Sequence, residues 1–255
     1  MDATGQFAIL GNLRQAVAQA VAWIARAEQQ QSSRRAVDYP ISRWYLRPAA
    51  TVLAHALATS RVRPWMVTLT GLAIATLAGA LLAFRPEFAS WSALLVLGTW
   101  FCDRLDGQLA RRQGSASALG AWLDANVDEL VDLGLHVALA GAAAASAASA
   151  WPWALLIGFL IGKYLLMYGL QSEAGLDPTP AAPAEFNAHA GRPRWWRGLY
   201  GLYHLPGNAD VRIHLLVAAL FTGWWTAELA LICVYYNFRW IVRYALVARR
   251  LGALR

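Results

Sequence analysis

Two pairs of aspartates stand inside a strongly apolar region of this 255-residue sequence. Asp103 and Asp106 are spaced i,i+3, and Asp124 and Asp128 are spaced i,i+4. At these spacings each pair lies on one face of its own helix. A carboxylate in a membrane-like setting is costly unless it is paired or binds a cation, so these residues indicate a functional site. Two helices that each present a carboxylate pair could converge on hard divalent cations, which prefer oxygen ligands.

The residues around these aspartates follow a fixed pattern, D-x2-D-G-x2-A-R-x8-G-x3-D-x3-D. Its eight fixed positions are all filled within 26 residues, by Asp103, Asp106, Gly107, Ala110, Arg111, Gly120, Asp124 and Asp128. In this motif the chain resembles the class I CDP-alcohol phosphotransferases, also called CDP-alcohol phosphatidyltransferases. The resemblance implies an integral-membrane enzyme of phospholipid biosynthesis. Such an enzyme moves a substituted phosphate group from a CDP-linked donor to an alcohol acceptor and releases CMP.

The same resemblance implies a metal site. Asp103, Asp106 and Asp124 would bind two divalent ions, Mg²⁺ or Mn²⁺, and the charges of four aspartates balance two dications. Asp128 would act as the general base and also contact the second ion. Whether its pKa suits that role is left open, because neighbouring carboxylates raise the pKa of an aspartate while metal ions lower it.

Further positions are expected to contact the CDP-linked donor. Gly107 and Ala110 would leave room for it, and Arg111 would present a forked guanidinium to its diphosphate. Gly120 is expected to permit close contact with the helix of residues 89–112. The remaining donor candidates are Arg63, Pro64, Trp65, Met66 and Ser117. The first four resemble the start of the family's first membrane helix, and Ser117 resembles a hydroxyl position after the second one.

The acceptor side is less determined by the sequence. Lys163 lies within an apolar run and therefore needs a partner, which could be an acceptor phosphate or an acidic counter-ion. Arg212 could bind an acceptor phosphate instead. Three histidines, His136, His204 and His214, are interpreted as structural groups rather than metal ligands.

Composition favours a membrane protein over a nucleic-acid binder. Hydrophobic residues make up 58% and charged residues 15% of the chain, whose net charge is +7. Soluble domains are closer to half apolar and a quarter charged. The arginines alternate with long apolar runs, which a nucleic-acid surface would not show. Cys102 and Cys233 lie in separate apolar runs and do not form a disulfide or zinc framework.

Hydropathy predicts an all-α integral-membrane fold, a bundle of six transmembrane helices preceded by amphipathic interfacial helices. A span needs about 20 mostly apolar residues. Helical spacing of apolar residues in 7–30 and 39–57 favours two helices at the membrane surface. We therefore divide the chain into an interfacial segment, 1–60, and a transferase domain, 61–255. The six candidate spans are 64–84, 89–112, 118–146, 151–172, 208–223 and 225–247.

Arginine placement predicts the orientation. Pairs or triplets of arginine flank one set of helix ends, whereas the opposite links carry only Arg85. By the positive-inside rule, the basic ends face the cytoplasm. The aspartate motif and both chain termini fall on that side of this multi-pass arrangement.

Other functions remain open at this stage. A CDP-choline or CDP-ethanolamine type of transferase would use the CDP-linked head group as its donor and diacylglycerol as its acceptor. It would not use CDP-diacylglycerol as the donor. A carboxylate-relay transporter would explain aspartates on one helix face but not Gly107, Ala110 and Arg111 at their spacings. A scaffold without activity is disfavoured because no motif position is missing. The family resemblance also implies membrane lipids as partners and a possible homodimer.

Overall fold

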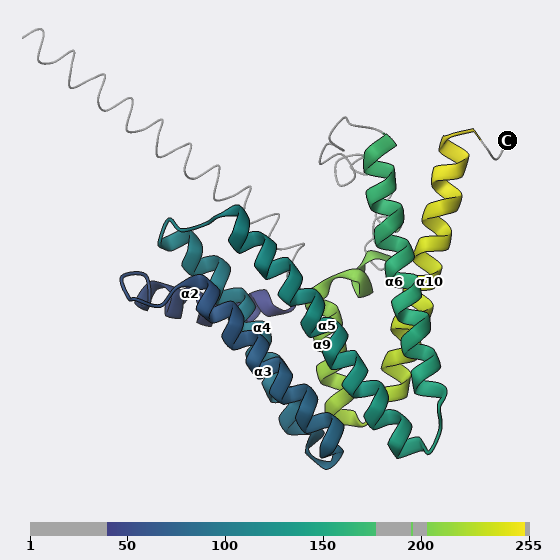
Figure 1. Cartoon of the computed structure of the whole chain (residues 1–255), viewed down its shortest axis with the longest axis horizontal. Coiled ribbons are helices and arrows are strands. Elements are labelled where there is room, and N and C mark those ends of the chain that lie inside the picture. The colour runs from purple at the N-terminus through teal and green to yellow at the C-terminus, as the bar shows by residue number, and fades with distance from the viewer. Residues whose placement is uncertain (1–39, 177–194, 196–202, 253–255) are drawn as a thin grey trace, which may run out of the picture.

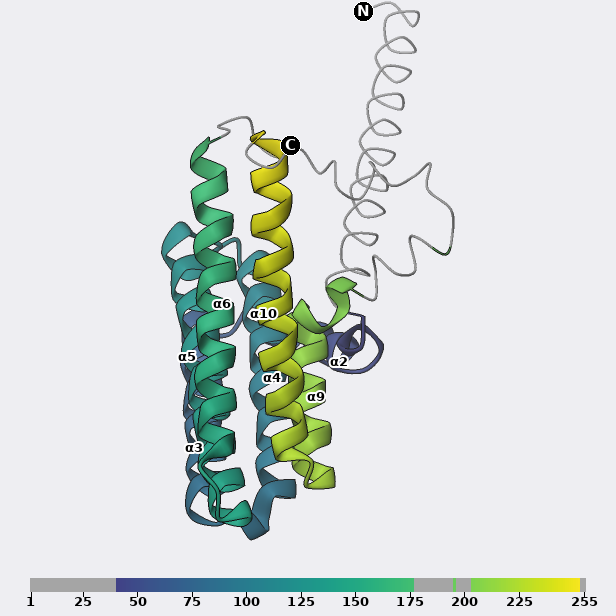
Figure 2. The same ribbon diagram turned by 90° about the vertical axis from the view of Figure 1, so that its right-hand side faces the viewer.

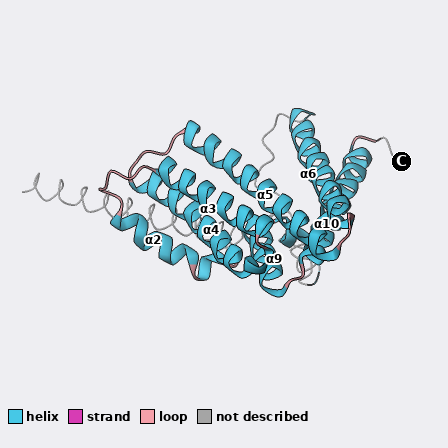
Figure 3. Cartoon of the chain, turned by 60° about the horizontal axis from the view of Figure 1, so that its bottom comes forward, coloured by secondary structure: helices cyan, strands magenta, loops and turns pink. Residues whose placement is uncertain are grey.

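The computed structural model describes residues 40–176, 195 and 203–252. Within these residues every regular element is a helix (Figure 3). The predicted interfacial helix of residues 7–30 lies outside the described part. The principal helices are α2 (Leu46–Ala56), α3 (Pro64–Phe84), α4 (Ala89–Arg112), α5 (Ala118–Ala147), α6 (Trp151–Leu176), α9 (Ala209–Thr222) and α10 (Trp225–Arg250). The short 3-10 turns are η1 (Ser42–Trp44), η2 (Pro86–Phe88) and η3 (Leu205–Gly207).

The long helices alternate in direction and form a bundle. Helices α3, α4 and α5 make one group, and α6 lies beside α10 (Figure 1). The two groups are close at the end that holds the α5–α6 and α9–α10 links and diverge at the other end. That wider end holds the α4–α5 link and the last turns of α6 and α10 (Figure 2). The bundle therefore brings the start of α5 next to the end of α4, where the motif lies.

Local sequence explains where the helices begin and end. Pro64 occupies the first turn of α3, where its missing N–H costs nothing. The Ser117 hydroxyl caps α5 by accepting from the Gly120 N–H at 3.1 Å. Gly223 ends α9 with φ of 77°, a left-handed conformation that glycine adopts readily. Ala148 ends α5 in the same region, with φ of 47°.

Small residues allow the helices to approach closely. A Cβ atom on Gly162 of α6 would lie 2.9 Å from the backbone nitrogen of Asn237 on α10. Ala75, Ala78 and Ala93 are buried in the principal core. These contacts fit membrane helices, whose association depends on close packing rather than on hydrophobic burial between them.

Among the described residues, three helices are long and apolar enough to cross a membrane: Pro64–Phe84, Ala118–Ala147 and Trp151–Glu173. The other three predicted spans are present as α4, α9 and α10, with bounds close to the expected ones. They do not meet the same criterion, since α9 has only 14 residues and the other two are less apolar. The all-helical class is confirmed, and the six-span count stays a prediction.

Of the predicted amphipathic stretch 39–57, the structure describes residues 40–57, which include η1 and α2 and are attached to the bundle. Its helix α2 packs against α4. The buried Asp210 carboxylate at the start of α9 accepts hydrogen bonds from the backbone N–H groups of Ile41 at 2.7 Å and Ser42 at 2.9 Å. The Thr51 hydroxyl contacts Gln108 of α4 at 2.5 Å. These bonds hold the segment beside the aspartate motif.

Candidate active site

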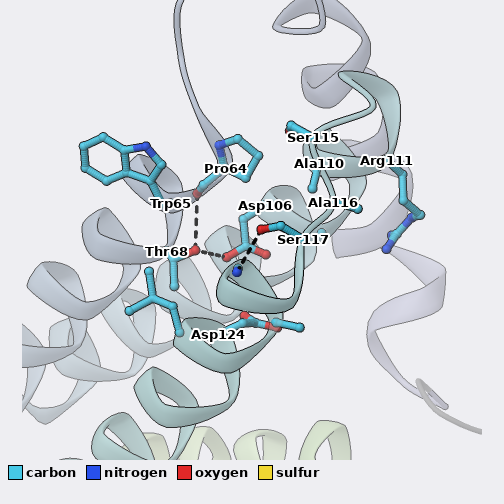
Figure 4. Close-up of a pocket in the computed structure, with 14 residues that line it drawn as sticks. Pro64, Trp65, Thr68, Asp106, Ala110, Arg111, Ser115, Ala116, Ser117 and Asp124 are labelled. Carbon is cyan, nitrogen blue, oxygen red and sulfur yellow. Dashed lines mark hydrogen bonds between the residues drawn. The ribbon is translucent and has the colours of Figure 1, made fainter.

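A cavity of about 210 Å³ opens where α3, α4 and α5 meet at the wider end of the bundle (Figure 4). Asp106 and Asp124 contribute the carboxylates of its wall. Most of its remaining lining is small or hydroxyl-bearing, including Gly107, Ala110, Ser115, Ala116, Ser117, Gly120 and Ala121. A cavity with acidic groups and small walls could admit a phosphate-bearing ligand together with cations.

Three aspartates of the motif converge. Asp103, Asp106 and Asp124 each offer a carboxylate oxygen, and these atoms all lie within 4.8 Å of one another. Carboxylate oxygens at this separation match the oxygen ligands that Mg²⁺ and Mn²⁺ prefer. The chemistry and spacing of this donor set therefore fit a divalent cation.

Thr68 orients one of the three carboxylates. Its hydroxyl donates to the Asp106 Oδ2 atom at 2.6 Å, and both residues are buried. Figure 4 shows this bond beside a second contact from the same hydroxyl to the Pro64 carbonyl. Because Thr68 lies one turn after Pro64, the N-terminal part of α3 helps to fix the position of Asp106.

Asp128 lies outside the converging triad, one turn further along α5. With Asp103 it lines a second, smaller pocket of about 40 Å³, which Arg212 and Asp132 also line. Asp103 thus belongs to the triad and also lines this second pocket. Asp128 is therefore not one of the three converging carboxylates, but it shares a pocket with one of them, Asp103.

Arg104 is a buried cation inside the motif. Its guanidinium forms an ion pair with the Asp103 carboxylate and lies 4.0 Å from the centre of the Trp100 ring. The Trp100 indole N–H in turn donates to the Asp210 Oδ1 atom at 2.8 Å. The position lies in the variable part of the motif, so sequence reasoning did not single it out.

The predicted donor residues are only partly brought together. Pro64, Trp65, Gly107, Ala110, Arg111 and Ser117 line the larger cavity. Arg63 and Met66 are not among its lining residues. Gly120 lines the cavity, and a Cβ atom there would meet only the Ser117 hydroxyl, at 3.3 Å. The expected close contact between Gly120 and α4 is therefore wrong, because the cavity separates the two at this level.

Lys163 and Arg212 converge on a single carboxylate. The Lys163 ammonium donates to Asp132 and to Glu129, each at 2.6 Å. The Arg212 guanidinium donates to the other oxygen of Asp132 at 3.0 Å. Lys163 therefore has the acidic partners that its counter-ion explanation expects. Arg212 nevertheless lines the smaller pocket, next to Asp103 and Asp128.

The histidines have structural partners. His136 is fully buried, and its ring contacts the Asp132 carbonyl at 2.6 Å and the Glu228 carboxylate at 3.4 Å. His214 contacts the Tyr45 hydroxyl at 2.5 Å. The ring of His204 lies 3.4 Å from Arg239. Their interpretation as structural groups agrees with these contacts.

Fold and site together define an all-helical protein with membrane-length helices and a carboxylate triad at one end of the bundle. The family model described as CDP-alcohol phosphatidyltransferase matches residues 61–181. This match to residues 61–181 agrees with the resemblance that the motif indicated.

Several characterised proteins are similar to this chain. A phosphatidylinositol phosphate synthase of Mycolicibacterium smegmatis is 38% identical over 136 residues, which are 50% of this chain and 61% of the relative. A bifunctional IPC transferase and DIPP synthase of Aquifex aeolicus is 27% identical over 153 residues, 59% of this chain and 31% of the relative. A CDP-diacylglycerol–serine O-phosphatidyltransferase of Encephalitozoon cuniculi is 41% identical over 86 residues, 31% of this chain and 22% of the relative. The chain thus spans less than two thirds of each of these relatives.

Proposed function

We propose that this protein is a membrane transferase that moves a substituted phosphate group from a CDP-linked donor to an alcohol acceptor and releases CMP. The observation that carries the proposal is the convergence of Asp103, Asp106 and Asp124 beside a cavity that Gly107, Ala110, Arg111 and Gly120 line. A carboxylate-relay transporter is not favoured, since the three aspartates lie together at one end of the bundle and not along its length.

In this proposal the triad binds the divalent ions, Mg²⁺ or Mn²⁺, and Asp128 adds a further carboxylate. When bound, two such ions supply positive charge against the diphosphate and the departing CMP. Gly107, Ala110 and Ser117 leave room for the donor in the cavity. The forked guanidinium of Arg111 suits a phosphate oxygen pair.

Asp128 is the proposed general base. The acceptor hydroxyl gives its proton to the Asp128 carboxylate while its oxygen bonds to the β-phosphorus of the donor. The bond between that phosphorus and the bridging oxygen breaks, and its electrons leave with CMP. The proposal places the acceptor in the smaller pocket, because Asp128 and Asp103 both line it.

Arg212 and Lys163 form the proposed acceptor side. Arg212 lines the smaller pocket, and Lys163 shares the carboxylate partner of Arg212. The relatives' names give CDP-diacylglycerol as a donor, serine as an acceptor and phosphatidylinositol phosphate as a product. We propose a CDP-diacylglycerol donor and a polar alcohol acceptor, with CDP-choline or CDP-ethanolamine plus diacylglycerol as the alternative pair.

We extend the proposal to the placement of the chain in the membrane. All six long helices, α3 to α6, α9 and α10, cross the cytoplasmic membrane as the transferase domain of residues 61–255. Residues 1–60 lie at its surface, and the site and both termini face the cytoplasm. The arginines that flank α3, α4 and α10 at the wider end support this orientation. A homodimer through the membrane helices, which the family resemblance implies, belongs to the same proposal.

The decisive experiment measures CMP release by the purified protein in detergent with Mn²⁺. CDP-diacylglycerol is offered with serine, inositol or inositol phosphate, and CDP-choline is offered with diacylglycerol. We expect release with one pair and its loss without Mn²⁺. Folded protein that releases no CMP from any pair would refute the proposal.

A variant pair tests the site in the same assay. Asp106→Asn removes a charged oxygen from the triad, and we expect CMP release to fall by at least about 100-fold. Glu87→Gln makes the same change at the opposite end of the bundle, where Glu87 is exposed and pairs with Arg85. Its activity should match that of the unmodified protein. Equal activity of both variants would exclude the triad as the reaction site.

A further inference from the structure

Arg104 places a fixed positive charge against the proposed metal ligands. It follows Asp103 directly, and only 9% of its surface is exposed. Its Nη2 atom forms an ion pair with the Asp103 Oδ2 atom. Asp103 is one of the three triad carboxylates, so Arg104 uses an oxygen of a group that a divalent cation would also use.

Neighbouring side chains hold this arginine in place. The Trp100 ring supports the guanidinium from one face at 4.0 Å, a cation–π distance. The ring is itself held by its hydrogen bond to Asp210, whose other oxygen binds the backbone of the 41–42 segment. Side chains from α4 and α9 therefore restrict where the charge of Arg104 can go.

The charge balance of the site gives this position a role. Three carboxylates within 4.8 Å of one another repel each other strongly when no cation is bound. Arg104 supplies one positive charge to that cluster. A divalent ion that arrives at Asp103 meets the same positive charge and competes with it for the carboxylate.

We propose that Arg104 is the resident counter-ion of the metal site: it stabilises the unloaded aspartate cluster and weakens the binding of divalent cations to it. Arg104 is a positioning residue, because it produces both effects through its ion pair with Asp103. The inference rests on the metal site of the proposed function but not on the identity of donor or acceptor.

The variant Arg104→Gln separates this role from simple packing. The metal-free variant should unfold at a lower temperature than the unmodified protein, because the cluster has lost its cation. Its dissociation constant for Mn²⁺ should fall on the order of tenfold, because the competing charge is gone. A packing defect alone would lower stability and weaken metal binding together.

Arg112→Gln is the matched control. It removes the same charge from the last turn of the same helix, where Arg112 is exposed and contacts His55 at 3.2 Å. Neither the metal-free unfolding temperature nor the Mn²⁺ dissociation constant should change appreciably. Calorimetric titration of detergent-purified protein with MnCl₂ measures the affinity, and a thermal unfolding scan without metal measures the stability.

Each result decides the inference. If the Arg104→Gln variant binds Mn²⁺ with unchanged or weaker affinity, the inference about Arg104 is wrong, although the proposed metal site is still supported. Unmodified protein that binds no Mn²⁺ overturns both. If the variant does not fold without metal, added MnCl₂ must restore a folded protein, since the ion replaces the missing charge; failure to do so also overturns the inference.

Discussion

The buried hydroxyl of Thr68 shows how one uncharged residue can control the aspartate site. Thr68→Val keeps the shape of the side chain but removes the 2.6 Å bond to Asp106. Groups that orient a metal ligand typically contribute about 10–100-fold to metal affinity. We therefore expect the Mn²⁺ dissociation constant of this variant to rise within that range in calorimetric titration.

Thr70→Val provides the matched control. Thr70 lies two residues further along α3, is exposed, and bonds only the Met66 carbonyl of its own helix with its hydroxyl. Its loss should leave Mn²⁺ binding unchanged. An equal weakening by both variants would show that the effect comes from α3 as a whole.

At the residue scale, helical spacing predicted that each aspartate pair lies on one face of its own helix, and the family resemblance implied the set of Asp103, Asp106 and Asp124. The sequence could not predict Thr68 or Arg104, whose contacts depend on how α3, α4 and α9 pack. The sequence left two partners of Lys163 open, an acidic counter-ion and an acceptor phosphate. The structure shows that Asp132 and Glu129, both on α5, pair with the ammonium.

Asp132 connects three elements of the bundle. Asp132 lies on α5, and its two carboxylate oxygens accept hydrogen bonds from Lys163 of α6 and Arg212 of α9. Asp132→Asn leaves two largely buried cations short of a negative charge. Breaking such a buried pair costs about 3–5 kcal/mol, and we expect a loss of that size in chemical unfolding experiments in detergent.

Glu129→Gln is the control at the same cluster. Glu129 also binds Lys163, but its side chain is 53% exposed, so the loss should stay below about 1 kcal/mol. Combining Asp132→Asn with Lys163→Met should recover part of the stability by removing one unmatched cation. Equal losses for the two single variants, or no recovery in the double variant, would contradict this account.

At the element scale, helix bounds were largely predictable from local signals. The spans 64–84 and 89–112 agree with α3 and α4 at both ends. Proline at the start of α3, the Ser117 cap of α5 and Gly223 after α9 all act within a few residues of the boundary. Which helices become neighbours could not be predicted, because contacts such as that of Gly162 with Asn237 join residues far apart in the chain.

Across the whole molecule, the alternating helices place the α4–α5 link and the α5–α6 link at opposite ends (Figure 2). The positive-inside rule then predicts that Ser115 faces the cytoplasm and Ser149 the other side. We expect an impermeant maleimide to label Ser149→Cys in intact cells and Ser115→Cys only in inside-out vesicles. Both variants are made in a background that lacks Cys102 and Cys233.

A membrane-permeant maleimide serves as the control for reactivity, since it should label both introduced cysteines. The background protein without cysteine should show no labelling. If the impermeant reagent labels Ser115→Cys from outside the cell, the proposed orientation is wrong, although the fold is unaffected.

The attachment of Ile41 and Ser42 to Asp210 has a consequence for how the protein is made. Partners in these bonds are 169 and 168 residues apart in the chain. During synthesis the segment of Ile41 and Ser42 therefore lacks its partner until most of the protein has emerged from the ribosome. Only after α9 has been synthesised can the backbone near Ser42 bind its acceptor, Asp210. The surroundings of Arg104 are thus completed late in biogenesis, so a nascent chain interrupted before Asp210 would lack them.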